Sequence, residues 1–350
     1  MRPIYFLLCF LGWSVKMAAQ PGFEYRQKLG FLLAHRDLME HLPQAPAVAS
    51  EFSYIYRTAA AKQWHQAYRQ PLVGGTLFFG SVGNNQILGR FLGLYGFVEL
   101  PIVKRKCYRL DFKFATGLGY TNKPFDPVLN PENIAIGSRV NALMCFAIKQ
   151  SWRWNNTALT FGIDMTHFSN ASYQMPNLGI NVPFLSLGVQ RFFAARSTEK
   201  KQTELARPDL TFGLTAIASA KEMRPLGVGR YPVYAGNIFA RKYFNTKGGL
   251  EASLDVIYKV GLLSHPSYPQ AAKLDPLQLG LFLGYVQSFD RLHFIYGAGV
   301  YLRDVLQPDE SVYIRLGTRY ALTEQLEALM TLKTHYAKAD YMELGLAYHF

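Results

Sequence analysis

Hydrophobic and polar residues alternate with a period of two along most of the chain. In residues 108–120, nearly every second position holds an apolar or aromatic residue, whereas arginine, aspartate, lysine and glycine occupy most of the positions between them. Similar alternation recurs in residues 134–149, 250–260, 292–302 and 312–319. Successive side chains of a β-strand point to opposite faces, so each segment predicts a strand with one apolar and one polar side.

The length of these segments favours strands that cross a membrane. They run for about ten residues or more, whereas strands of soluble sheets most often have about five or six, and a tilted membrane strand needs about ten. Aromatic residues gather at segment ends, as in an interfacial girdle. The final stretch, Met342–Phe350, alternates up to a terminal phenylalanine and resembles the closing strand of bacterial outer-membrane barrels. We therefore predict an all-β fold, a transmembrane antiparallel β-barrel.

The candidate strands fall into two groups. We count about sixteen, with eight in residues 23–194 and eight in residues 209–350. Because the polar stretch between the groups is short, we favour one barrel of about sixteen strands over the alternative of two eight-stranded barrels in tandem. The predicted organisation is a signal peptide (1–19), a first barrel half (20–194), a linker (195–209) and a second barrel half (210–350).

Composition narrows the class of protein. Of 350 residues, 49% are hydrophobic and only 17% are charged, whereas soluble domains average roughly 25% charged residues. Mean hydropathy is close to zero, and beyond residue 15 no apolar run approaches the roughly 18 residues of a membrane helix. These values exclude a helical membrane protein and a disordered chain, and they argue against an ordinary soluble enzyme.

The N-terminus and the net charge indicate export and an anionic lipid partner. Arg2, the apolar stretch Ile4–Trp13 and the small residues of Met17–Ala19 form the pattern of a secretory signal. The formal net charge is +13; an exported chain without a nucleic-acid motif meets lipid headgroups rather than nucleic acid. Export also permits a disulfide, so Cys107 and Cys145 could either pair or remain free.

One strand carries polar side chains where apolar ones are expected. His167 and Ser169 continue the apolar, lipid-facing row that starts at Leu159, and Asn181 begins the corresponding row of the next strand. Residues i and i+2 of a strand lie about 7 Å apart on one face, and a histidine is the usual base that activates a serine. A third group that orients the imidazole completes such a site. The pattern therefore predicts catalysis by Ser169, His167 and Asn181 at the rim of the barrel's outer wall.

Two neighbouring motifs connect this site with a known family. The motif Thr-His-Phe-Ser-Asn-Ala (166–171), followed by Pro-Asn-Leu-Gly-Ile (176–180), resembles the active-site signature of the lipid A 3-O-deacylase family. These are eight-stranded outer-membrane barrels, also called acyloxyacyl hydrolases. The resemblance implies a serine esterase that removes an ester-linked acyl chain from lipid A of lipopolysaccharide in the outer leaflet. It also implies that no metal or other cofactor takes part.

The resemblance assigns roles to individual residues. It implies that His167 is the base and Ser169 the nucleophile, and that Asn177 and backbone amides near Asn170 form the oxyanion hole. In the family a glutamate usually follows the Gly-Ile pair, whereas this chain has Asn181 there. An asparagine can orient an imidazole through its carbonyl oxygen but cannot stabilise the imidazolium by charge. A non-enzymatic barrel, either a pore or a binding protein with a decayed motif, is therefore the alternative.

Strand order also predicts where the site lies. With a periplasmic N-terminus, the seventh strand rises and ends near Ser169 at the outer surface, where lipopolysaccharide resides. A similar triplet, Thr334–Tyr336, places His335 on a lumen-facing row, so we expect His335 to be noncatalytic. We expect no metal site, and no sequence feature indicates an oligomeric state.

Overall fold

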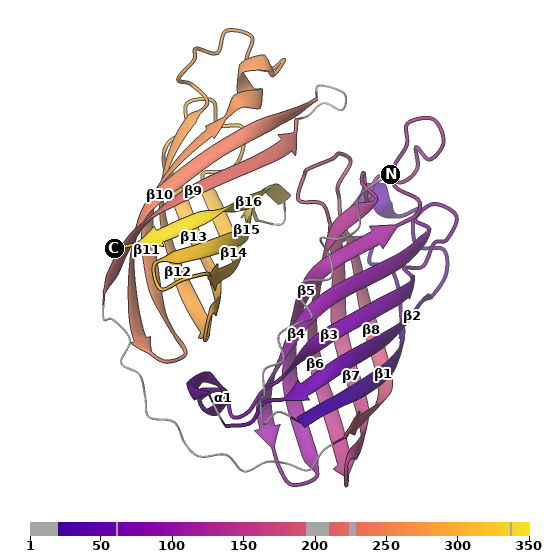
Figure 1. Cartoon of the computed structure of the whole chain (residues 1–350). Helices are drawn as coiled ribbons and strands as arrows, with labels where there is room; N and C mark the ends of the chain where they lie inside the picture. The colour runs from indigo at the N-terminus through magenta and orange to yellow at the C-terminus, as the bar shows by residue number, and fades with distance from the viewer. Residues whose placement is uncertain (1–19, 61, 194–209, 224–228, 337) are drawn as a thin grey trace, which may run out of the picture.

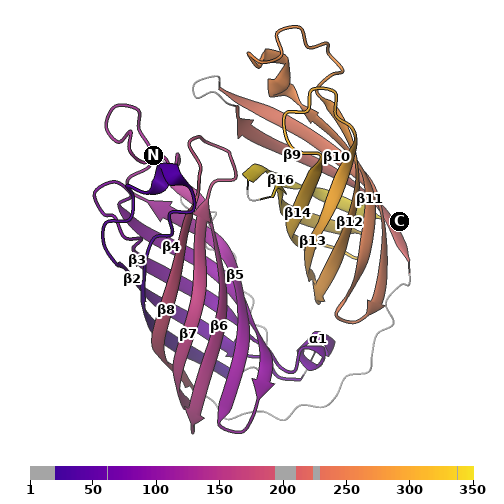
Figure 2. The same cartoon turned by 180° about the vertical axis from the view of Figure 1, so that it is seen from behind.

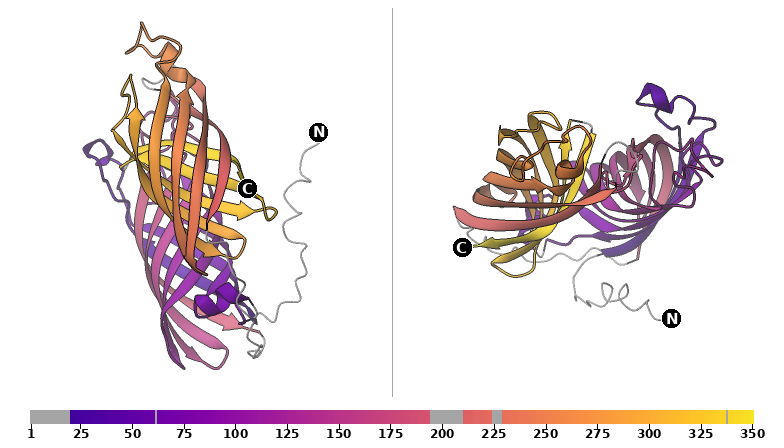
Figure 3. Two further views of the ribbon diagram at one scale, coloured as in Figure 1. Left: turned by 90° about the vertical axis from the view of Figure 1, so that its left-hand side faces the viewer. Right: turned by 90° about the horizontal axis from the view of Figure 1, so that it is seen from above.

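The chain forms two closed antiparallel β-barrels of eight strands each (Figures 1 and 2). The computed structural model describes residues 20–60, 62–193, 210–223, 229–336 and 338–350. The predicted signal peptide and linker lie outside the described residues. Figure 3 shows that the two barrels lie side by side.

The strands of both barrels are long and follow one another without crossovers. The first barrel consists of β1 (Gln20–Gly30), β2 (Ala47–Arg57), β3 (Leu72–Ser81), β4 (Arg90–Lys104), β5 (Tyr108–Thr121), β6 (Val140–Trp154), β7 (Thr157–Ser169) and β8 (Ile180–Phe192). The second consists of β9 (Thr211–Glu222), β10 (Arg230–Asn245), β11 (Gly248–Lys259), β12 (Leu277–Phe289), β13 (Leu292–Arg303), β14 (Val312–Ala321), β15 (Leu326–His335) and β16 (Lys338–His349).

The strand pairing shows that our preference for one large barrel was wrong and confirms the alternative of two barrels. Strand β8 returns to pair with β1, from Gly22 opposite Phe192 to Gly30 opposite Phe184. In the same way β16 pairs with β9. Each half therefore satisfies the edges of its own sheet, which is what closure into a barrel achieves. The length of the connecting stretch, on which our preference rested, has no influence on this pairing.

The connections differ in length at the two ends of each barrel. In the first barrel the β1–β2, β3–β4, β5–β6 and β7–β8 connections (31–46, 82–89, 122–139, 170–179) meet at a long-loop end, where the short helix η1 (Asp37–Met39) lies. Turns at the opposite end are short (105–107, 155–156), apart from the β2–β3 connection, which carries α1 (Gln63–Ala67). In the second barrel the connections are also longer at one end, where η2 (Val260–Ser264) lies (Figure 1). Among the described residues, no helix is long and apolar enough to cross a bilayer.

Side chains alternate between an apolar exterior and a charged interior. In β7, Leu159 and Ile163 are exposed, whereas Asp164, the residue after Ile163, is only 4% exposed. Buried charges pair across the lumen: Lys28 lies 2.9 Å from Glu51 and 2.8 Å from Asp164. In the second barrel the buried arginines and carboxylates form similar pairs: Arg241–Glu327, Arg315–Glu343 and Arg319–Glu251. An apolar band that faces outward is the arrangement of a barrel in lipid.

The two cysteines of the described chain are both free. Cys145 lies in the lumen on β6, opposite Ala115 of β5, whereas Cys107 is exposed in the β4–β5 turn. The pairing register of β5 and β6 therefore separates the two thiols, and no disulfide forms between them.

Candidate active site

The end of β7 and the start of β8 place the predicted site residues at the long-loop end of the first barrel. His167 and Asn181 are direct partners in the β7–β8 ladder. Along β7, every second residue up to Ser169 is at least partly exposed, whereas the residues between are buried. His167 and Ser169 therefore lie on the outward row, as the alternation predicts.

The imidazole of His167 is held by Asn181. His167 Nδ1 lies 2.7 Å from Asn181 Oδ1. Since an amide oxygen can only accept, this contact requires the proton on Nδ1 and leaves Nε2 free to accept one. His167 Nε2 has no hydrogen-bond partner among the described residues. The ring is therefore in the tautomer that a general base requires.

Glycine is required next to this imidazole. Gly179 has a φ of +83°, and a Cβ built on it would lie 3.0 Å from His167 Cε1. A left-handed backbone is accessible to glycine without steric cost. Gly179 therefore turns the chain into β8 while leaving room for the imidazole.

The hydroxyl of Ser169 is surrounded by donors from the β7–β8 loop. Asn177 Nδ2 donates to Ser169 Oγ at 2.9 Å, and the backbone N–H of Ala171 donates to the same oxygen at 3.2 Å. The N–H of Asn170 binds Asn177 Oδ1 at 3.0 Å, which orients the amide so that its NH₂ group faces Ser169. Two donors thus converge beside the hydroxyl, where an oxyanion would form.

One expected contact, between His167 and Ser169, is absent from the structure. No hydrogen bond joins His167 to Ser169, although they are two positions apart on the same face of β7; the Ser169 hydroxyl is bound to the loop instead. The side chain of Asn170 points inward, where its Nδ2 donates to Ser138 Oγ at 2.9 Å. Asn170 therefore contributes to the site through its backbone, by fixing Asn177.

Sequence reasoning missed His35, in the β1–β2 loop. Asn181 Nδ2 lies 3.2 Å from His35 Nδ1, and His35 Nε2 lies 3.1 Å from the carbonyl oxygen of Leu178. With Nε2–H donating to Leu178, Nδ1 of His35 accepts from the Asn181 amide. His35 thereby fixes which end of the Asn181 side chain faces His167. No local sequence signal marks a contact between loops so distant in the chain.

Residues of the second barrel form hydrogen bonds with the β7–β8 loop, which lies directly after Ser169. The Glu222 backbone N–H donates to Ser172 O at 2.9 Å, and Glu222 Oε2 accepts from the Met175 N–H at 2.6 Å. Ser172 Oγ donates to Ala339 O at 2.8 Å, and Arg230 Nε donates to the neighbouring Tyr173 O at 2.9 Å. Ser172 has a φ of +62°, an unfavourable conformation for a residue with a Cβ. These bonds therefore stabilise a tight turn three residues after Ser169.

Comparison with known proteins finds a matching family model for each half of the chain. Residues 49–190 match the family model of lipid A 3-O-deacylase (PagL), and residues 209–350 match that of the acyloxyacyl hydrolase C-terminal domain. The chain belongs to the lipid A 3-O-deacylase family. The first match contains every site residue described above except His35, and the family is one of ester hydrolases. The predicted resemblance is thus confirmed.

Other comparisons contribute less. No curated protein matches the chain. Among solved structures, one variant of Rhodopseudomonas blastica porin is 9% identical, with a TM-score of 0.21, covering 95% of this chain and all of the porin. A triple mutant of the same porin is 8% identical with a TM-score of 0.18 and the same coverage. Superpositions this poor support no further inference about this family member.

One cluster in the second barrel has the residue types of a metal site. The ligand atoms of Asp309, His335 and Asp340 lie within 4.8 Å of one another. Lys259 occupies the same region, 3.0 Å from Asp309 and 2.8 Å from Asp340, so the carboxylates are already paired with a cation. The geometry therefore supports a salt-bridged lumen. His335 is buried there, as predicted, where its Nε2 lies 3.1 Å from the Tyr301 hydroxyl.

Proposed function

We propose that the protein is an outer-membrane esterase that removes an ester-linked acyl chain from lipid A by a Ser-His-Asn mechanism. The observation that carries the proposal is the 2.7 Å contact between His167 Nδ1 and Asn181 Oδ1, with Ser169 two residues further along the same outward row. An asparagine in place of the family's usual glutamate thus keeps the orienting contact. Family membership supplies the substrate class.

In the first half-reaction, Ser169 Oγ attacks the ester carbonyl carbon while its proton passes to His167 Nε2. The side chain of Ser169 must turn away from Asn177 to do so. The Asn177 NH₂ group and the Ala171 N–H, 2.9 and 3.2 Å from Oγ, are then released to stabilise the oxyanion. Collapse of the tetrahedral intermediate breaks the ester C–O bond, and the sugar oxygen takes the proton from His167.

In the second half-reaction, water attacks the acyl-serine. His167 accepts a proton from the water and returns it to Ser169 as the fatty acid leaves. Throughout both steps, Asn181 keeps the Nδ1 proton in place. It does so by geometry rather than by charge, because its side chain is neutral.

The ends of the barrel support an orientation in the membrane. Outer-membrane barrels have short periplasmic turns and longer extracellular loops. Ser169 lies at the end that carries the longer loops, 31–46, 122–139 and 170–179. We therefore propose that the site opens at the outer leaflet, and that the chain reaches the outer membrane by means of its N-terminal signal.

Lipid A acylation in living cells tests the proposal. The full chain and its Ser169→Ala variant are expressed in a Gram-negative host, and lipid A is examined by mass spectrometry. We expect lipid A to lose one acyl chain with the wild type and to stay unchanged with Ser169→Ala. Unchanged lipid A in cells that contain the folded wild-type barrel would refute the proposal.

The alternative of a pore finds little support in the first barrel. Paired side chains such as Lys28, Glu51 and Asp164 are less than 5% exposed and occupy its lumen. Eight-stranded barrels have an interior just wide enough for side chains to fill. Single-channel recording in planar bilayers tests this alternative, and we expect no conductance steps from the purified protein.

A further inference from the structure

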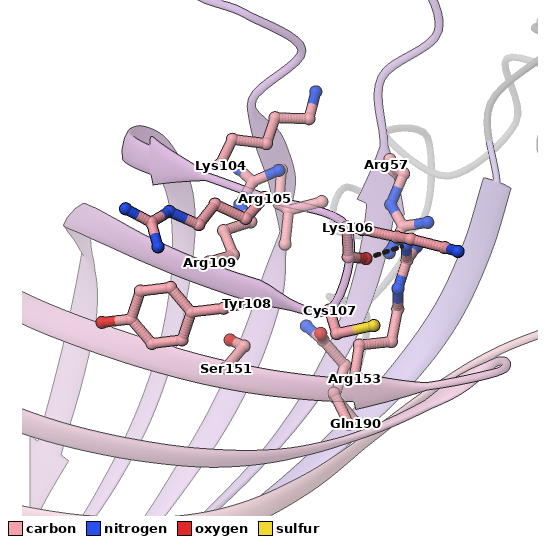
Figure 4. Close-up of a pocket in the computed structure, with 12 residues that line it drawn as sticks. Arg57, Lys104, Arg105, Lys106, Cys107, Tyr108, Arg109, Ser151, Arg153 and Gln190 are labelled. Atoms are coloured by element: carbon pink, nitrogen blue, oxygen red, sulfur yellow. Dashed lines mark hydrogen bonds between the residues drawn. The ribbon is translucent and has the colours of Figure 1, made fainter.

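A cavity opens at the short-turn end of the first barrel, opposite the end that carries Ser169 (Figure 4). Its volume is about 370 Å³. It is lined by the ends of β2, β6 and β8, the starts of β3, β5 and β7, and the β4–β5 turn. Ala158, in its wall, and Ser169 lie at opposite ends of β7, which separates the two sites by about 36 Å at roughly 3.3 Å per residue.

The charged side chains that line this cavity are all cations. They are Arg57, Lys104, Arg105, Lys106, Arg109 and Arg153. Figure 4 shows Arg57, Lys106 and Arg153 close together, whereas the ammonium group of Lys104 points away from them. Among the described residues no carboxylate lines the cavity, so neighbouring cations repel one another unless a counter-charge binds between them.

Hydrogen bonds position several of these cations without neutralising them. Arg109 pairs with Asp111, which lies 2.6 Å away. Arg153 Nη2 donates to a neutral backbone oxygen, that of Lys106, at 2.8 Å. Within the described residues, Arg105, Lys106 and Arg153 form no ion pair with a carboxylate. The site therefore carries an uncompensated positive charge.

Two buried polar groups at the cavity independently indicate a missing partner. Ser151 and Gln190 line it and are only 5% and 3% exposed. Ser151 Oγ and Gln190 Nε2 have no hydrogen-bond partner in the described structure. Buried polar groups are nearly always hydrogen-bonded, because leaving one unsatisfied costs free energy. Both can donate to an acceptor in the cavity.

We propose that this cavity is an anion site that binds a phosphate group. Guanidinium forks match the paired oxygens of a phosphate, and lysine ammonium groups add point charges. Ser151 and Gln190 supply two neutral donors from the lumen side. A phosphate oxygen satisfies the buried donors and the cations at once. The site is separate from the proposed esterase and does not depend on it.

The phosphate can come from a phospholipid headgroup or from a soluble phosphate. The test uses the full chain, folded in a non-ionic detergent, and isothermal titration calorimetry at constant ionic strength. One arm titrates inorganic phosphate, and the other titrates dihexanoyl phosphatidylglycerol below its micelle concentration. Saturable binding in the first arm identifies a soluble ligand, whereas binding in the second arm alone identifies a lipid headgroup.

Variants locate the binding. Arg105→Gln combined with Lys106→Gln changes two turn side chains that form no hydrogen bond with the described residues, so folding is preserved. We expect this variant to raise the Kd for the ligand that binds at least about tenfold, because charge-assisted hydrogen bonds are lost. The matched control combines Lys242→Gln with Lys273→Gln, two exposed lysines of the second barrel, and leaves the Kd unchanged.

A second variant tests the lumen side of the site. Ser151→Ala removes a buried donor without changing the charge, and we expect it also to weaken binding. The proposal is overturned if neither ligand binds. It is also overturned if the Arg105/Lys106 variant binds as tightly as the wild type and the lysine control.

Discussion

The proposed mechanism depends most directly on the contact between Asn181 and His167. We expect Asn181→Ala to lower kcat for lipid A deacylation by about 10- to 100-fold. The removed bond, 2.7 Å long, becomes charge-assisted when His167 takes up a proton, and such bonds contribute about 1.5–3 kcal/mol. At about 1.4 kcal/mol for each factor of ten, this loss corresponds to the expected range.

Asn181→Asp provides the opposite test, because aspartate is isosteric with asparagine. A carboxylate at the same position attracts the imidazolium by at most about 4 kcal/mol at an effective dielectric constant of 20 and a separation of 4 Å. Desolvation of the carboxylate offsets much of this attraction. We therefore expect kcat to rise by about tenfold.

The assay uses purified, folded protein in mixed micelles of non-ionic detergent and lipid A. Fatty acid release is followed by mass spectrometry, and kcat is taken at a saturating mole fraction of lipid A. Asn85→Ala, which changes an exposed asparagine of the β3–β4 loop, is the control and should match the wild type. A kcat for Asn181→Ala within twofold of the wild type would refute the reasoning.

Three further predictions concern His35, Gly179 and Glu51. His35→Ala should lower kcat by about two- to tenfold, the value of one neutral hydrogen bond, but should have little effect in an Asn181→Asp background, where no amide needs orienting. Gly179→Ala should lower kcat about tenfold, since a Cβ at φ +83° is strained by about 1–2 kcal/mol and approaches His167 Cε1 at 3.0 Å. Glu51→Leu should lower the free energy of unfolding in urea by about 3–5 kcal/mol, because buried cations lose their partner.

Each of these predictions has an outcome that contradicts it. Equal loss of activity from His35→Ala in both backgrounds would mean that His35 acts on the fold rather than on the amide of Asn181. Wild-type kcat in Gly179→Ala would show that the imidazole has more room than the structure indicates. For Glu51, the exposed Glu40→Gln is the control, and an equally small change in both would mean that the lumen charges are hydrated.

Much of this fold could be predicted because alternation is a local property. The period of two, visible in residues 108–120, identifies strands and assigns each side chain to the lumen or the exterior. It thereby identified His167 and Ser169 as exceptions in an outward row. Which strands pair across the sequence could not be predicted in this way. The pairing of β8 with β1 is made by backbone hydrogen bonds, which depend little on the identity of the side chains. The alternation pattern is therefore the same for one barrel and for two.

The site shows the same division between local and long-range information. Asn181 was predicted because it follows a recognisable motif on the next strand. His35 was not, because its contact with Asn181 spans 146 residues and depends on how the β1–β2 loop folds back over β8. The resemblance implied backbone amides near Asn170 as oxyanion donors, but it did not single out the Ala171 N–H, whose direction follows from a left-handed backbone at φ +53°.

The outward position of His167 and Ser169 has a consequence for kinetics. A site on the side wall of a barrel receives substrate by lateral diffusion within one leaflet, not from the surrounding water. The relevant concentration is then the mole fraction of lipid A in the membrane, and KM has the units of a surface density. Adding inert lipid should slow the enzyme at constant bulk concentration, whereas diluting the whole suspension should leave the rate per enzyme unchanged.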